Sequence, residues 1–354
     1  MIGNLKIIFV ACILIMVFIQ YFISTQNKWL DFTHEADNLV QEGKYQEAYN
    51  LQKKAVQRSK SLFSNKRNTK LAFAENGLGN ICSAMGNYNE AVSCFLQAGE
   101  IYLTTFGKND DTVATSYCGL GGAYLKMGEL SEAEDFSNES ISIFTKNHGD
   151  CFENNVTAKS ILGQIYFEEK KYESSENIYL ELLKCISSGG VSLGYQIFIY
   201  SQLGIICQYE KKYKLEEHYY EEAQMLSQED PNTSVRVKIT NLRNMAIAFF
   251  LNKKFDESEN SDTQILELVN STPGDFSWEK AGVFLSFAQN EKGLKNINKT
   301  REYIGEAMSE YAKVGFEPLE NKKGFLEPCL HIYLWLGDYK KQKYIQRLME
   351  ELSS

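Results

Sequence analysis

Residues 78–98 read LGNICSAMGNYNEAVSCFLQA, and this stretch decides the fold. Apolar or small residues recur every three or four positions on both sides of Gly86, which is the spacing of one helix face. The Gly-Asn-Tyr phrase between the two runs is typical of a helix end, because glycine readily adopts the left-handed conformation that closes a helix. The stretch therefore predicts two helices joined by a tight turn at Gly86.

The same phrase returns at a nearly constant step along the chain. Its marker residues lie 43, 42, 42, 41, 42, 42 and 42 positions apart: Tyr45, Tyr88, Leu130, Tyr172, Tyr213, Phe255, Ile297 and Tyr339. Ten residues before most markers stands a Leu-Gly pair or a softer version of it: Leu78-Gly79, Leu120-Gly121, Leu162-Gly163, Leu203-Gly204, Met245-Ala246 and Phe287-Ala288. A repeat this regular predicts an all-α solenoid of about eight helix-turn-helix units, with close helix approach at the small residues.

The repeat also sets the expected domain organisation of this 354-residue chain. A length of this kind usually indicates two or three globular domains, but the repeat leaves no room for one. We expect a short tail over 1–4, a membrane helix over 5–24, a linker over 25–30 and one solenoid over 31–354. The expected repeats lie near 31–70, 71–112, 113–153, 154–194, 195–235, 236–277, 278–320 and 321–354.

These features resemble the tetratricopeptide repeat family. Besides the Leu-Gly pair and the Gly-x-Tyr turn, the chain has an aromatic residue four positions after that leucine, as in Tyr124 and Tyr166. A small residue also follows the marker by three in Ala48, Ala91, Ala133 and Ser175. The usual unit has about 34 residues, so the longer step is similar to the kinesin-light-chain type. The resemblance implies a right-handed α-solenoid that binds proteins or peptides, without enzyme activity or cofactor.

The amino terminus carries an apolar stretch, LKIIFVACILIMVFIQYFI over residues 5–23. As a helix it would reach roughly 28 Å, close to the thickness of a bilayer core. Residues 23–26 match a signal-peptidase site poorly, and too few apolar residues precede Cys12 for a lipoprotein box. The sequence therefore predicts a retained single-pass membrane anchor, with a cleaved signal peptide as the main alternative. The few flanking lysines leave its orientation open.

Charge is unevenly distributed. The chain has a net charge of −9, which argues against nucleic acid as a partner. Residues 44–70 nevertheless carry eight basic residues against Glu47 alone. This stretch is either a solvated helix face followed by a basic loop, or a contact with anionic lipid beside the expected anchor.

No arrangement of residues indicates catalysis. Phosphate-loop, zinc-protease and nucleophile-elbow motifs are missing from the sequence. Gly119, Gly121 and Gly122 fall inside an expected repeat helix, where they serve packing. Cys82 and Cys207 occupy the same repeat position and are expected in the core, and the four histidines are dispersed. We therefore expect no catalytic, cofactor-binding or metal-binding residues.

The binding surface is expected on the first helix of each repeat, because in the family this helix lines the concave side. Polar candidates for a partner-binding groove are Asn76, Asn80, Ser83, Ser160, Gln164, Ser201, Gln208, Arg243, Asn244 and Gln289. Their amides and hydroxyls both donate and accept hydrogen bonds, which suits a peptide backbone. The alternative is that they are ordinary solvent-facing helix positions.

Three lysine pairs precede their markers: Lys170-Lys171, Lys211-Lys212 and Lys253-Lys254. They form either a basic rim along the solenoid or simple helix caps, since lysine is favoured at a helix C-terminus. The leading hypothesis is a membrane-anchored scaffold that holds a peptide or a partner helix on its concave face. A structural subunit of a membrane assembly and a peptide-sensing receptor are the alternatives.

Overall fold

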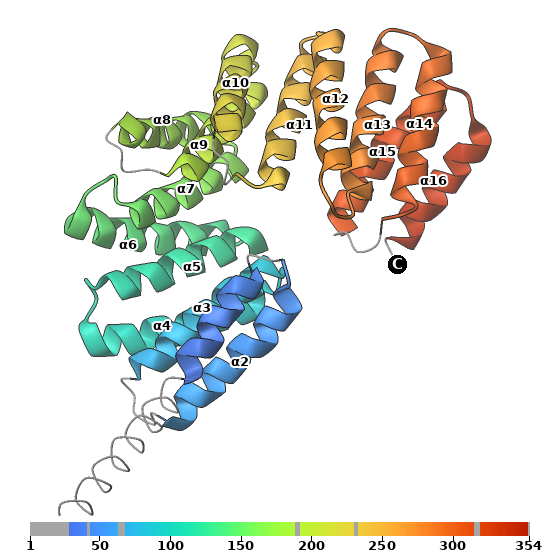
Figure 1. Cartoon of the computed structure of the whole chain (residues 1–354). Helices are drawn as coiled ribbons and strands as arrows, with labels where there is room; N and C mark the ends of the chain where they lie inside the picture. The colour runs from blue at the N-terminus through green and yellow to red at the C-terminus, as the bar shows by residue number, and fades with distance from the viewer. Residues whose placement is uncertain are drawn as a thin grey trace, which may run out of the picture. The chain divides into compact units, whose positions relative to one another are not determined.

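The computed structural model describes residues 28–40, 43–62, 68–187, 192–229, 233–314 and 319–352. Within these ranges the regular structure is α-helical throughout, and each helix pairs with the next as a hairpin (Figure 1). After a helical stretch over 28–40 come α2 (Tyr45–Leu62), α3 (Thr69–Ala84), α4 (Tyr88–Phe106), α5 (Asp111–Met127), α6 (Leu130–His148), α7 (Glu153–Glu168), α8 (Tyr172–Ser187), α9 (Leu193–Tyr209), α10 (Tyr213–Glu229), α11 (Val235–Leu251), α12 (Phe255–Ser271), α13 (Ser277–Gly293), α14 (Ile297–Tyr311), α15 (Leu319–Trp335) and α16 (Tyr339–Glu351). The predicted all-α helical repeat is confirmed.

In every repeat, the second helix begins directly after the predicted turn. All eight marker residues are the first residues of α2, α4, α6, α8, α10, α12, α14 and α16. At the turn quoted first, the Gly86 N–H donates to the Ser83 carbonyl at 3.1 Å and the Asn87 N–H to the Cys82 carbonyl at 2.8 Å. This pair of hydrogen bonds satisfies the last carbonyls of α3 and reverses the chain. Gly86 has φ +79°, so the expected left-handed cap is confirmed.

Four turns use lysine where the others use glycine. Lys170, Lys211, Lys253 and Lys295 adopt φ values of 60–62°. The first member of each lysine pair therefore occupies the left-handed position that ends the first helix, and whether its charge also stabilises that helix end stays a prediction. The second members are held by carboxylates: Lys171 by Glu169 at 2.8 Å, Lys212 by Glu210 at 2.8 Å and Lys254 by Glu217 at 2.6 Å. Much of the charge expected along a rim is therefore balanced locally.

The Leu-Gly pairs are close helix contacts, as predicted. A Cβ atom added to Gly163 would lie 2.8 Å from the Tyr179 ring, and one added to Gly121 would lie 2.5 Å from the Ser137 hydroxyl. Real Cβ contacts are not that short, so α7 packs on α8, and α5 on α6, at a distance only glycine permits. The buried Tyr179 hydroxyl donates to the Ser160 carbonyl at 3.1 Å, which fixes the ring over the glycine.

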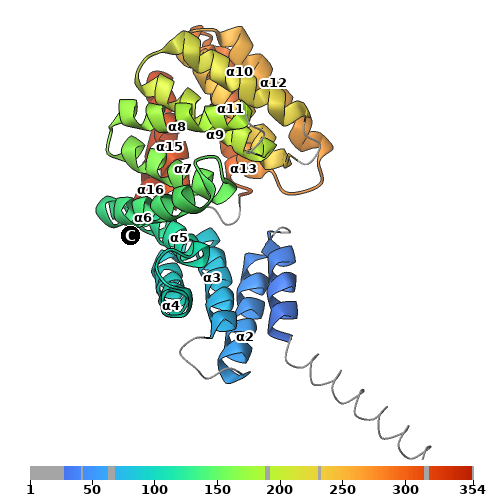
Figure 2. The same ribbon diagram turned by 90° about the vertical axis from the view of Figure 1, so that its left-hand side faces the viewer.

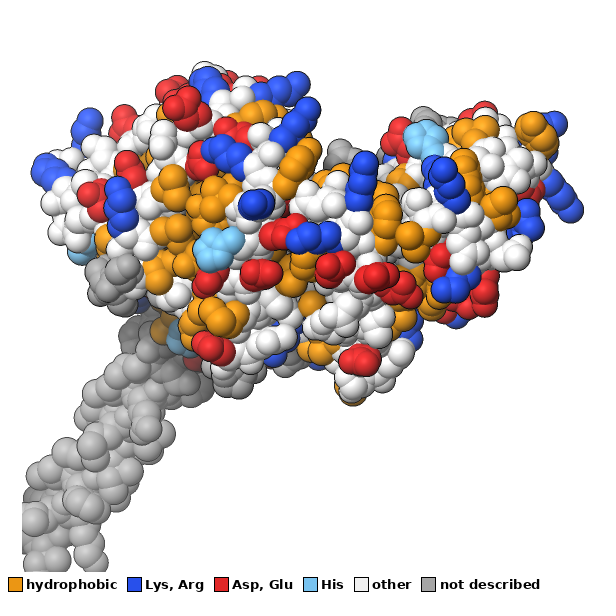
Figure 3. All heavy atoms as spheres, turned by 90° about the horizontal axis from the view of Figure 1, so that it is seen from above, with side chains coloured by type: hydrophobic (Ala, Val, Ile, Leu, Met, Phe, Trp, Pro, Cys, Tyr) orange, Lys and Arg blue, Asp and Glu red, His pale blue; other side chains and the backbone are white. Residues whose placement is uncertain are grey.

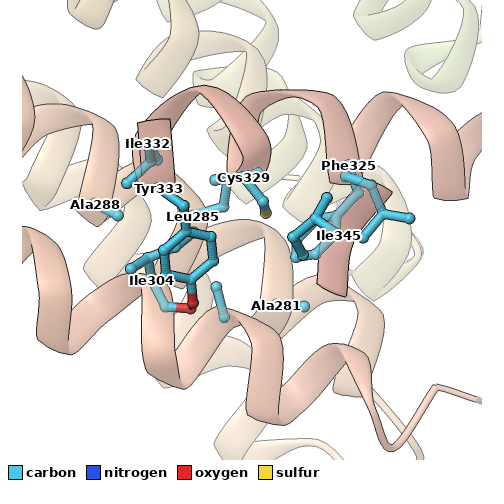
Figure 4. Packing of buried hydrophobic residues seen from close by; sticks show 11 residues of the cluster. Ala281, Leu285, Ala288, Ile304, Phe325, Cys329, Ile332, Tyr333 and Ile345 are labelled. Carbon is cyan, nitrogen blue, oxygen red and sulfur yellow. The ribbon is translucent and has the colours of Figure 1, made fainter. Parts of the chain in front are cut away.

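The chain divides into two compact units, Met1–Val191 (unit 1) and Ser192–Ser354 (unit 2), which are described separately. Figure 2 gives a second view of the hairpins within each. The core of unit 1 contains Phe95, Leu120 and Phe144. The largest core cluster of unit 2 joins its last helices, where Tyr333 lies over Ile304 (Figure 4).

The structure contains a disulfide bond that the sequence did not predict. Cys151, just before α7, is bonded to Cys185 near the end of α8, and their Cα atoms are 5.2 Å apart. Seven of the eight cysteines lie in the repeats and none is spaced as CxxC, so the sequence gave no hint of this pair. Cys82 and Cys207 are buried and take no part in the disulfide, as expected for core positions.

The membrane prediction requires a correction. Among the helices that the structure describes, none combines the length and apolar character that crossing a bilayer requires. Even the apolar α9 has only 17 residues and carries Gln196, Ser201 and Gln202. The stretch over 5–24, on which the predicted anchor rests, lies outside the described residues. The described residues form a helical solenoid, and neither the predicted membrane helix nor single-pass membrane localisation is supported.

Contact of residues 44–70 with anionic lipid is likewise unsupported. Most of the stretch forms α2, where the Lys53 ammonium donates to the Tyr49 hydroxyl at 3.0 Å and lies 4.0 Å from Glu90. These contacts direct Lys53 toward the neighbouring hairpin and favour the helix-face interpretation. Residues 63–67 lie outside the described ranges.

Candidate functional site

The first helices of unit 1 form a groove with a cavity of about 400 Å³. Helix α5 contacts both α3 and α7, and all three contribute to the lining. The lining residues are Asn80 and Ser83 from α3; Thr115, Cys118, Gly119, Gly122, Ala123 and Lys126 from α5; Asn154, Thr157 and Ile161 from α7; and Tyr88, Phe95 and Phe144 from the second helices. We call this cavity the α3–α5–α7 groove.

The floor of the groove is apolar because two of its α5 residues lack side chains. A Cβ atom on Gly119 would lie 2.6 Å from the Phe95 ring, so this glycine leaves the aromatic ring within reach of the groove. Gly122 faces Ile161, whose Cδ1 would lie 3.6 Å from an added Cβ atom. The two glycines thus widen the groove, and they confirm that the glycines of α5 serve packing.

Polar groups stand along the walls. Asn80 and Asn154 are exposed, and their side-chain amides have no hydrogen-bond partner among the described residues. Thr115 and Thr157 donate to carbonyls in their own helices, Asp111 at 2.9 Å and Glu153 at 3.2 Å. The groove therefore offers two open amides above an apolar floor, with the Lys126 ammonium at one end of α5.

The thiol in the groove is unreactive. Burial raises the pKa of Cys118 to about 12, so the side chain stays protonated at neutral pH. A protonated thiol is a poor nucleophile and a poor metal ligand. Within the described ranges, no group of three or more His, Cys, Asp or Glu side chains is arranged to hold a metal ion.

Of the predicted groove residues in unit 1, the structure brings Asn80 and Ser83 to this site. Asn76 instead accepts a hydrogen bond from the Ser116 hydroxyl at 3.1 Å and joins α3 to α5. Ser160 is buried and donates to the Val156 carbonyl at 2.8 Å. Gln164 is half-buried and hydrogen-bonds Tyr179. These three positions support the packing of the repeats.

The remaining predicted residues belong to unit 2. Ser201 is buried and donates to Ile197 and to the Asn241 side chain, at 2.8 and 3.0 Å. Arg243 is half-buried on α11, beside the buried carboxyl of Asp262. Gln208, Asn244 and Gln289 are half-buried first-helix residues. Five of the ten candidates thus lie in unit 1 and five in unit 2.

Several groove residues were missed because the cavity crosses the three helices obliquely. It touches the last turns of α3, runs along α5, and reaches only the first half of α7. A fixed offset from each marker therefore selects two groove residues on α3, Asn80 and Ser83, and none on α7, where Asn154 and Thr157 line the groove. A rule that moved toward the helix N-terminus in each successive repeat would have found them.

The comparisons with known proteins agree with this fold. The tetratricopeptide repeat family model matches residues 70–146, from α3 into α6. The apo form of the quorum sensor NprR from B. thuringiensis is 12% identical and superposes with a TM-score of 0.68, covering 93% of this chain and 88% of that one. The apo form of RapI is 11% identical, with a TM-score of 0.58 over 80% of this chain and 97% of that one.

A Rap protein complexed with competence and sporulation factor is also similar. It is 12% identical, with a TM-score of 0.55, and covers 93% of this chain and 98% of its own. At these identities the likeness establishes a shared helical-repeat fold. A comparison with curated protein sequences gives no match.

Proposed function

We propose that this chain is a binding protein without catalytic chemistry, which holds an extended segment of a partner protein in the α3–α5–α7 groove. The main support for this proposal is that Asn80 and Asn154, on the two helices that flank α5, have side-chain amides without a hydrogen-bond partner among the described residues. An extended backbone presents alternating N–H and C=O groups, and each amide can pair with both. The apolar floor formed by Phe95 and Ile161 accepts a side chain between them.

The composition of the groove is typical of a site that binds a specific ligand. Most of its lining is apolar, while a few polar groups are placed at its edges, an arrangement typical of ligand pockets. The tetratricopeptide repeat model matches residues 70–146, which include the α3 and α5 parts of the groove. Membrane attachment forms no part of the proposal.

A second candidate function is that of a sensor, for which the segment is a free peptide. It is favoured by the likeness to the quorum sensor NprR, which extends over 93% of this chain. The two candidates differ in what is captured: a scaffold retains a larger protein, whereas a sensor retains a small peptide. Mass spectrometry of material co-purified with the full-length chain separates them.

The test uses synthetic peptides covering the captured partner, with binding measured by fluorescence polarisation. Replacing Asn80 and Asn154 together by Ala should weaken binding at least about tenfold, because two hydrogen bonds each contribute roughly 1 kcal/mol. The control replaces Asn89 and Asn138 by Ala, since these exposed amides lie on the second helices α4 and α6. Equal affinity of both double variants would exclude the groove as the binding surface.

A further inference from the structure

A second cavity lies at the last hairpin of unit 2 and is independent of the groove. It measures about 530 Å³ and is lined by Gly305 and Met308 from α14, Tyr333 from α15, and Lys340, Lys341, Lys343, Tyr344 and Arg347 from α16. These three helices are consecutive in the chain, and Figure 1 shows them together. We call this cavity the C-terminal pocket. Five of its eight lining residues come from one helix.

The charge of the pocket is not balanced by the protein. None of the side chains of Lys340, Lys341, Lys343 and Arg347 forms an ion pair with any described residue. Other lysines of unit 2 do: Lys299 pairs with Glu291 at 2.8 Å, for example. A chain with net charge −9 thus concentrates four unpaired cations around one cavity. Figure 3 shows one face of the molecule, on which basic and acidic side chains are interspersed.

The placement of these cations is unfavourable for the helix that carries them. Lys340 and Lys341 lie in the first turn of α16, where the helix dipole favours acidic residues; the N-cap Asp338, which accepts from the Lys341 N–H at 3.1 Å, precedes that turn, and the turn itself contains no acidic residue. Lys343 and Arg347 are four residues apart, so like charges face each other on one helix side. Stability therefore does not account for this pattern.

The base of the pocket is apolar and well fixed. The Tyr333 ring is buried, and its hydroxyl approaches the Ile304 carbonyl at 3.5 Å, as the orientation of the two residues in Figure 4 shows. The Lys341 ammonium lies 5.1 Å above this ring, a favourable cation–π geometry. Gly305 adds no side chain, and Met308 offers an adaptable apolar contact. The cavity can therefore hold an apolar side chain beside the basic residues of α16.

We propose that the C-terminal pocket is a docking site for an acidic segment of a partner protein. Carboxylates of the segment pair with Lys340, Lys343 and Arg347, and a neighbouring apolar side chain enters between Met308 and Tyr344. Charge complementarity selects the acidic segment, and the apolar base selects a protein segment over a polyphosphate backbone, which has no apolar group to place there. The site lies on second helices α14 and α16, apart from the first-helix groove.

The experiment uses the full-length chain and three labelled probes. These are a twelve-residue peptide of alternating Asp/Glu and Leu, the same peptide with Gln for each acidic residue, and an oligothymidylate of twelve nucleotides. We expect the acidic peptide to bind at least tenfold more tightly than the Gln peptide, and the advantage to shrink as salt is raised. Equal binding of the two peptides, or tighter binding of the oligothymidylate, would overturn the proposal.

Two variants locate the binding. Lys343→Glu with Arg347→Glu should reduce acidic-peptide affinity at least tenfold. Arg301→Glu with Lys214→Glu changes the net charge equally at exposed positions outside the pocket, so its affinity should stay within about twofold of the unmodified chain. Equal loss in both variants would mean that net charge, and not the pocket, controls binding.

A third variant distinguishes lost binding from lost folding. Lys340→Glu with Lys341→Glu places acidic residues at the start of α16, where the helix dipole favours them. Its melting temperature should therefore rise or stay constant while peptide binding falls. A variant that kept full affinity would contradict the assignment of these lysines to the site.

Discussion

At the residue scale, the turn between the two helices of a repeat adopts the left-handed backbone conformation with lysine as well as with glycine. Gly43, Gly86, Gly128 and Gly337 have φ values of 70–80°, and Lys170, Lys211, Lys253 and Lys295 have nearly the same backbone conformation. A residue with a Cβ atom is strained there, whereas glycine is not. The repeat therefore dictates the backbone conformation even where the residue does not favour it.

Replacing Lys211 by Gly should raise the free energy of unfolding by roughly 0.5–1 kcal/mol, because the strain is removed and the exposed side chain makes no ion pair among the described residues. Chemical denaturation measures this. The reverse change, Gly86→Lys, should lower stability by a similar amount. A loss of stability in Lys211→Gly would mean that the lysine side chain contributes more than its backbone strain removes.

Glu216 is a second residue that departs from its repeat position. It occupies the column of Ala91 and Ser175, is fully buried, and neither carboxyl oxygen has a hydrogen-bond partner within the described part of the chain. Burial, and then the nearby charge of Glu217, raise its pKa to about 7. The folded protein thus keeps this carboxyl protonated up to a higher pH than the unfolded chain does.

Since the pKa of Glu216 is higher in the folded than in the unfolded state, its contribution is favourable at low pH and is lost as pH rises. The unfolding free energy should fall between about pH 4.5 and pH 7, by roughly 3 kcal/mol from this group. Glu216→Gln should flatten this decline and raise stability at pH 8, while Glu221→Gln, an exposed change in the same helix, should not. Parallel pH curves for the two variants would contradict the assignment.

At the element scale, helix packing depends on the glycine of the Leu-Gly pair. Gly163→Ala should lower the free energy of unfolding by roughly 1–3 kcal/mol, because the new Cβ atom would meet the buried Tyr179 ring at 2.8 Å. Gly324→Ala in α15 is the control, since no atom lies within 4 Å of its added Cβ. That change should be neutral or stabilise by up to about 1 kcal/mol through helix propensity. If Gly163→Ala and Gly324→Ala shifted the denaturation midpoint equally, contact with the Tyr179 ring would not explain the effect of Gly163→Ala.

The helices themselves were predictable because their signals are local. A left-handed cap and apolar spacing act within a few residues, so each marker residue coincides with the start of a second helix. The groove was only partly predictable: Asn80 and Ser83 were found, whereas Asn154 and Lys126 were not. Their positions depend on how successive hairpins rotate against one another, which no single repeat encodes. The basic residues of α16 can be read from the sequence, but only the structure shows that they line a cavity.

At the scale of the whole molecule, the Cys151–Cys185 disulfide closes the last hairpin of unit 1. It spans 34 positions, and a covalent loop of that size stabilises a fold by roughly 3–4 kcal/mol through the restricted unfolded chain. Cys151→Ser should therefore lower the melting temperature under non-reducing conditions. Reductant should lower that of the unmodified chain and have no further effect on the variant. A melting curve of the unmodified chain that ignores reductant would show that the bond adds no stability.

The same bond also limits how far the chain can be drawn out. Pulled from its two ends until every helix has unravelled, the oxidised molecule keeps residues 151–185 tied together at a Cα–Cα distance of 5.2 Å. A free segment of that size would extend by about 110 Å at 3.3–3.6 Å per residue. In an optical trap, adding reductant should lengthen the fully stretched molecule by that amount, so the tether length reports the redox state of one cysteine pair.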